Sequence, residues 1–104
     1  MKCLAAPMRV HPRSGPWRPT ESSALIAIQL ELDRHGLMTD YTQGNDDDSG
    51  PWRAFYNRMT GRVVAIVARS KAGYELLWAD RTSVHAEKMD QLVLVARSEL
   101  CRCT

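Results

Sequence analysis

Thiols and imidazoles are the side chains of this sequence that could hold a metal ion or serve as nucleophile and base. Its 104 residues include three cysteines and three histidines: Cys3, Cys101, Cys103, His11, His35 and His85. Zinc sites use pairs such as Cys-x₂-Cys with histidines at matching spacing, whereas the last two cysteines here form a Cys-x-Cys close to the C-terminus. We therefore expect reduced thiols without a metal role, and neither a metal nor another cofactor.

Carboxylates gather in the segment Gln43 to Gly50, which contains Asp46, Asp47 and Asp48 in succession. Calcium loops place their ligands at alternate positions, because side chains of consecutive residues point in different directions. The Gly, Asn and Asp content of this segment instead predicts a solvated loop.

Catalytic motifs are missing from the sequence. No serine or cysteine stands in a Gly-x-Ser-x-Gly elbow, and Gly61 and Gly73 are isolated glycines and not a phosphate-binding loop. His85 falls on an apolar segment, where histidine is more often a structural residue than a catalyst. We expect a protein that is not an enzyme.

The elements that would position any site centre on residues 51–79. Residues 52–57, 62–69 and 73–79 are rich in β-branched and aromatic residues and predict three antiparallel strands. Two polar turns that contain Gly61 and Gly73 separate them. Residues 37–42 predict a short fourth strand at one edge.

A helix is predicted on each side of this meander. The first is capped by Thr20, runs to about His35 and stops at Gly36, with apolar residues at helical spacing. The second begins at Thr82 or Ser83 and continues to the C-terminal region. Its apolar surface is wide enough either for the core alone or for a homodimer contact. The fold class is α+β: a three- to four-stranded antiparallel meander with one helix before and one after, both packed on one face.

The two faces of the meander are predicted to differ. Trp52, Ala54 and Tyr56 alternate onto an aromatic face that should pack against the helices. The other face, open to solvent, would carry the candidate partner-binding residues Arg53, Phe55 and Leu77. Arginine beside aromatic residues is typical of interface hot spots.

Charge and composition divide the chain into two parts. Residues 1–19 form a basic, proline-rich arm that we expect to be mobile, and residues 20–104 form a single domain. Apolar content of 44% and charged content of 25% are ordinary for a globular domain, and no apolar run approaches the roughly 20 residues that cross a bilayer. We expect a cytoplasmic protein.

Two functions fit this outline. The first is a small protein-interaction module, regulatory or inhibitory, which binds another protein or a second copy of itself. The second is a nucleic-acid-binding domain that uses the basic arm and the basic residues near the turns, Arg58, Arg62, Arg69 and Lys71. Its predicted helix, three strands and helix match the order in double-stranded RNA-binding domains, but the Lys-Lys-x-Ala-Lys sequence that opens their last helix is absent.

A second resemblance is carried by a motif in the meander. It consists of Pro51-Trp52, Phe55, Thr60-Gly61, Val63-Val64-Ala65, Ala68-Arg69 and Gly73-Tyr74. With the helix and acidic loop before it, this segment resembles short bacterial proteins, mainly from alphaproteobacteria, over about residues 22–79. The resemblance implies the fold and carries no assigned activity. A histidine often follows the Val-Val-Ala of that group, and this chain has Ile66 there.

Overall fold

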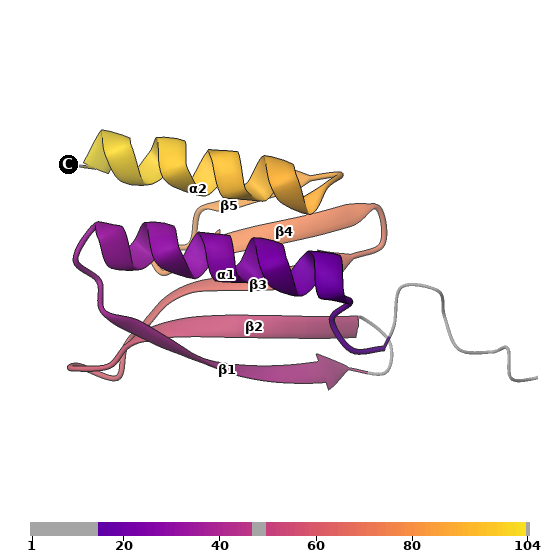
Figure 1. Ribbon diagram of the computed structural model, residues 1–104, viewed down its shortest axis with the longest axis horizontal. Coiled ribbons are helices and arrows are strands. Elements are labelled where there is room, and N and C mark those ends of the chain that lie inside the picture. The colour runs from indigo at the N-terminus through magenta and orange to yellow at the C-terminus, as the bar shows by residue number, and fades with distance from the viewer. Residues whose placement is uncertain (1–14, 47–49, 104) are drawn as a thin grey trace, which may run out of the picture.

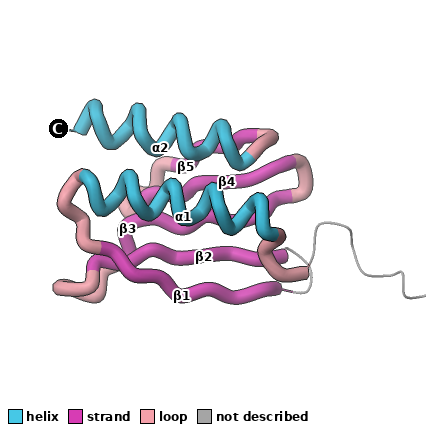
Figure 2. The backbone as a smooth tube through the Cα atoms, viewed as in Figure 1, coloured by secondary structure: helices cyan, strands magenta, loops and turns pink. Residues whose placement is uncertain are grey.

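The computed structural model describes residues 15–46 and 50–103, which form a two-layer α+β fold. One layer is an antiparallel sheet in the order β1-β2-β3-β4-β5, and both helices lie on one face of it (Figure 1, Figure 2). In chain order the elements are α1 (Pro19–Arg34), β1 (Thr39–Asp46), β2 (Gly50–Asn57), β3 (Val63–Ser70), β4 (Gly73–Trp78), β5 (Ser83–Ala86) and α2 (Met89–Cys103). The predicted fold class is confirmed, but the sheet has five strands instead of three or four.

Helix α1 has a defined start and end. Arg18 is the N-cap residue, its backbone N–H donates to the Glu21 carboxylate, and Pro19 occupies the first turn, where a missing N–H costs nothing. At the other end Gly36 adopts a positive φ of 83°, and the N–H groups of Gly36 and Leu37 donate to the carbonyls of Asp33 and Leu32. This is a Schellman motif, so the predicted stop at Gly36 is confirmed.

Strand β1 is longer than the sequence indicated. The expected edge strand ended at residue 42 and was followed by a loop from Gln43 to Gly50. Instead β1 continues to Asp46, with Gln43 opposite Arg53 and Gly44 opposite Trp52. Pairing with β2 satisfies backbone groups that a loop would leave to water, and this outweighs the weak strand propensity of Gly, Asn and Asp. Asp47 and Asp48 lie outside the described residues.

The largest departure from the prediction is at residues 83–86. The helix expected from Thr82 or Ser83 begins only at Met89, and Ser83–Ala86 form β5, paired with β4 from Tyr74↔Ala86 to Leu77↔Ser83. Val84 and Ala86 alternate toward the helices, whereas His85 is exposed on the sheet. A period of two therefore governs this segment, and His85 is not on a helix.

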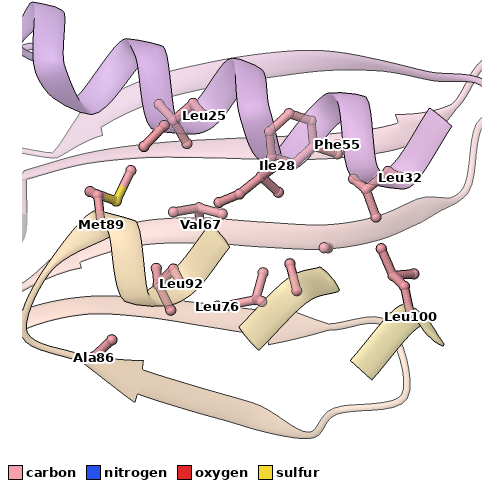
Figure 3. Close-up of a cluster of buried hydrophobic side chains, with 13 residues drawn as sticks. Leu25, Ile28, Leu32, Phe55, Val67, Leu76, Ala86, Met89, Leu92 and Leu100 are labelled. Atoms are coloured by element: carbon pink, nitrogen blue, oxygen red, sulfur yellow. The ribbon is translucent and has the colours of Figure 1, made fainter. Parts of the chain in front are cut away.

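The core lies between the sheet and the helices (Figure 3). Leu25, Ile28 and Leu32 of α1 meet Phe55, Val67 and Leu76 of the sheet, and all six side chains have no exposed surface. Helix α2 adds Met89, Leu92, Ala96 and Leu100. The apolar residues of α2 that point inward therefore pack in the core of the single chain.

A buried ion pair joins α1 to β3. The Arg69 guanidinium donates to both carboxylate oxygens of Glu21, at 2.5 and 3.1 Å, and the Tyr74 hydroxyl donates to the same carboxylate. Burial raises the pKa of Glu21, but the hydrogen bonds from Arg69, Tyr74 and the Arg18 N–H outweigh it and leave that pKa below its ordinary value.

Residues 15–18 extend the domain on its N-terminal side. Arg69 also donates to the carbonyls of Gly15 and Pro16, and the Trp17 ring lies 5.6 Å from the Arg69 guanidinium carbon. The arm predicted over residues 1–19 therefore includes residues that pack on the fold, and residues 1–14 lie outside the described part of the chain. No helix in the described ranges is both long and apolar enough to span a membrane.

Candidate binding face

The face of the sheet that points away from the helices is the candidate binding surface. Strand pairing arranges its side chains in rows across the sheet. One row is Thr42, Ala54, Ile66, Leu77 and Ser83. The next is Gly44, Trp52, Ala68, Glu75 and His85, and a third begins Asp40, Tyr56 and Val63. We call this surface the open face.

The centre of the open face is apolar. Val63 and Leu77 are 45% and 40% exposed, and Trp52, Tyr56 and Ile66 are half-buried around them. These side chains are contiguous through the strand pairing, unlike the single exposed apolar residues that any surface carries. An apolar area of this kind on one face of a two-layer fold is typical of a surface that another molecule covers.

A shallow hollow lies on the open face between β3 and β4. It has a volume of about 260 Å³ and is lined by Val63, Ile66, Leu77, Trp78, Ala79 and Arg81. Arg81 adopts a positive φ of 75°, a strained conformation for a residue with a side chain, at the rim of this hollow.

The position of Trp52 depends on Gly44 of the neighbouring strand. A Cβ atom added to Gly44 would lie 2.5 Å from the Trp52 ring, closer than real Cβ atoms approach. The indole therefore lies across β1 where glycine leaves room for it. This arrangement widens the apolar area toward the edge of the sheet.

Charges on the open face lie around its apolar centre. Asp40 and Asp46 are on β1, and Glu75 and His85 are on β4 and β5. Within the described residues, no lysine or arginine belongs to the three rows, and Arg81 stands at the rim of the hollow. The open face is thus apolar at its centre and acidic along the β1 edge.

The predicted partner-binding residues do not share this face. Leu77 lies on it, but Phe55 and Arg53 point toward the helix layer, where Phe55 has no exposed surface and Arg53 is 6% exposed. The assignment of faces in β2 was wrong because Trp52 and Tyr56, although aromatic, stay half-exposed, and the single Phe55 fills the core under α1. Alternation alone defines two faces and does not say which one a helix covers.

Arg53 is buried without a carboxylate partner among the described residues. Its guanidinium carbon lies 4.0 Å from the centre of the Tyr41 ring, and Nε and Nη2 donate to the Gln43 Oε1 at 3.1 and 2.7 Å. Burial lowers the pKa of Arg53, and the interaction with Tyr41 offsets part of this. Arg53 therefore stabilises the β1–β2 pair and is not an exposed hot spot.

The four residues proposed for nucleic-acid binding are not gathered in one place. Arg58 and Arg62 flank the β2–β3 turn, Lys71 lies in the β3–β4 turn, and Arg69 is buried against Glu21. Strand β3 separates the two turns by its eight residues, which is about 25 Å at the usual rise per residue. The structure also has five strands between its helices, so the order of elements in double-stranded RNA-binding domains is not reproduced.

A second concavity lies at the end of the layers where both helices finish. Its volume is about 620 Å³, and apolar side chains line most of it. Its polar groups already bind one another: the Trp78 indole N–H donates to Glu99, Glu99 pairs with Arg102, and Asp80 accepts from Thr82. These polar groups therefore already have hydrogen-bond partners within the chain and are not left over to bind a ligand.

One cysteine and one histidine lie close together in the structure. The Cys101 sulfur lies 4.0 Å from Nε2 of His35, whose Nδ1 lies 2.9 Å from the Glu31 carbonyl oxygen. Among the described residues, no group of three histidine, cysteine or acidic side chains is close enough to hold a metal ion.

Comparison of this chain with protein-family models, with curated proteins and with solved structures finds no match.

Proposed function

We propose that this chain is a small, non-enzymatic protein-interaction module that binds its partner through the open face and acts by regulation or inhibition. The observation that carries this proposal is the apolar centre of the open face, made by Trp52, Tyr56, Val63, Ile66 and Leu77 from three adjacent strands. Protein interfaces typically have a centre of tryptophan, tyrosine and aliphatic residues that is surrounded by a polar rim.

The charges of the open face favour a protein over a nucleic acid. Phosphate backbones are bound by lysine and arginine, and the edge of this face at Asp40 and Asp46 is acidic. The basic residues that the domain carries near its turns lie at opposite ends of β3. An extended nucleic acid along the open face would meet few positive charges.

A photo-crosslinking residue tests the proposal directly. Leu77 is replaced by p-benzoylphenylalanine in the full chain, and Leu94, an exposed leucine of α2, is replaced in a matched control. Irradiation in an extract of the source cells should give protein adducts from position 77 and few from position 94. Adducts to RNA or DNA, or equal yields from the two positions, would contradict the proposal.

A further inference from the structure

The rows of the open face are arranged so that the face complements itself. We propose that its partner is a second copy of this chain, packed face to face about a two-fold axis that runs along β3. This inference rests on the proposed function of the open face and names the occupant.

The area of the face is sufficient for such a dimer. The strands β1, β2 and β3 have eight residues each, β4 has six and β5 has four, so at about 3.3 Å per residue and about 4.8 Å per strand the face covers roughly 540 Å² in each copy. Two copies then bury roughly 1,100 Å², just above the roughly 1,000 Å² that a specific interface needs. Interfaces at this lower limit are typical of weak, transient complexes.

The sizes of the side chains match across this axis. A two-fold axis along β3 places β2 of one copy over β4 of the other, so the small Ala54 faces Leu77 of the second copy, and the reverse. In the third row, Tyr56 faces the position of Ala79, which lines the hollow between β3 and β4. Each copy thus supplies two large side chains, Tyr56 and Leu77, and two recesses, at Ala54 and Ala79.

One pair of charges matches as well. The same axis places β1 of one copy over β5 and the loop before it in the other. Asp40 at the start of β1 then faces Arg81, whose side chain lines the hollow and makes no ion pair within the described residues. In the second row, His85 of one copy faces Gly44 of the other.

A two-fold axis that lies in the interface but runs perpendicular to the strands also keeps the strands of the two copies aligned. This axis places β1 of one copy over β1 of the other and reverses the order of the rows. Asp40 of each copy then faces Asp46 of the other. Like charges at both ends of the same edge oppose this packing. The charge of Asp40 therefore favours the axis along β3, which places Arg81 opposite it.

Sedimentation equilibrium of the full chain over about 1–300 μM tests the dimer, a range that suits a weak complex. The wild-type chain should pass from monomer to dimer. Leu77→Glu should weaken the dimer at least about 100-fold, because the carboxylate would be buried opposite Ala54. Leu94→Glu, at an exposed position on α2, should leave the Kd within about twofold. Loss of the dimer in Leu94→Glu, or its persistence in Leu77→Glu, would overturn the assignment.

Charge exchange tests the axis. Asp40→Arg and Arg81→Asp should each weaken the dimer about tenfold, because each places two like charges together, and the chain that carries both changes should recover most of the affinity. Both residues are exposed, so folding is preserved in all three variants. Absence of recovery in the double variant would contradict the axis along β3.

Cysteine crosslinking adds a measurement at β3, the strand that lies on the axis. In a chain with Cys3, Cys101 and Cys103 replaced by serine, Ala68→Cys should join to itself through a spacer of about 10 Å, the separation of packed sheets. Thr42→Cys should not, because β1 faces β5. Equal yields from the two positions, which the axis across the strands predicts, would overturn the proposal.

Failure of the dimer is distinguishable from failure of the proposed function. If the purified chain stays monomeric at 300 μM while the crosslinker at position 77 still captures another protein in the extract, the second copy is wrong and the open face keeps its function. If neither pure chain nor extract gives a protein adduct at position 77, both are wrong.

Discussion

Both faces of the sheet carry apolar side chains, but the two faces bury them differently. On the face under the helices, Phe55, Val67 and Leu76 are completely covered by α1 and α2. On the open face, Trp52, Tyr56 and Leu77 lie at adjacent positions of the same strands and keep part of their surface exposed. The covered face therefore supplies most of the stability of the monomer, whereas the apolar side chains of the open face stay partly exposed to solvent.

Neighbouring leucines of β4 offer the sharpest contrast between the faces. Leu76→Ala should lower the free energy of unfolding by about 3–5 kcal/mol, because a completely buried side chain leaves a cavity. Leu77→Ala should lower it by less than about 1 kcal/mol in the monomer. Urea denaturation at low protein concentration measures both, and equal losses would contradict the assignment of faces.

The ion pair under α1 gives the next largest effect. Arg69→Met should destabilise the fold by about 3 kcal/mol, because it leaves the Glu21 carboxylate buried without its cation. Arg102→Met removes an exposed pair with Glu99 and should change stability by less than about 0.5 kcal/mol. Similar losses in the two variants would show that Glu21 and Arg69 are not buried together.

The pH dependence of stability follows from the same carboxylate. The pKa of Glu21 is lower in the folded chain than its ordinary value of 4.5, so its contribution is fully present above that value and is lost as the pH falls through the folded value. Urea denaturation between pH 7 and pH 3 should show wild type more stable than Glu21→Gln at neutral pH, with the difference narrowing below about pH 4.5. A constant difference across this range would contradict the pair.

The smallest effect concerns the open face alone. Gly44→Ala should move the Trp52 indole, because the new methyl group would overlap the ring, at a cost of about 1 kcal/mol. The Trp52 indole N–H resonance should shift, and those of Trp17 and Trp78 should not. In a Trp52→Ala background the same change should be nearly neutral, and an equal cost there would show that the ring does not lie over Gly44.

Much of the fold could be predicted from local signals. The turns at Gly61 and Gly73, the helix stop at Gly36 and the central strand β3 all follow from glycine placement and β-branched content. Strand β5 could not be predicted, because Thr82 and Ser83 followed by Glu87 are equally typical of a helix start. Pairing with β4 decides its structure, and a Cβ on Gly73 would approach the Ala86 carbonyl oxygen to 2.3 Å, a contact that no local pattern shows.

The candidate site was predictable only in part. Alternation separates Trp52 and Tyr56 from Arg53 and Phe55, but which set the helices cover depends on how α1 and α2 dock. Leu77 was placed on the open face correctly, whereas Arg53 and Phe55 were not. The hollow beside Arg81 depends on the connection between β4 and β5, whereas the sequence predicts that a helix begins at Thr82 or Ser83.

Covalent footprinting of the unmodified chain tests the central claim most directly. A short-lived carbene reagent labels exposed side chains, and mass spectrometry compares the dilute chain in buffer with the chain at about 300 μM and with the dilute chain in an extract of its source cells. Labelling of Tyr56, Val63 and Leu77 should fall several-fold in the concentrated sample or in the extract, while that of Leu94 stays constant. Unchanged labelling of the open face in both samples, or protection of Leu94 in its place, would contradict the claim that this face binds the partner.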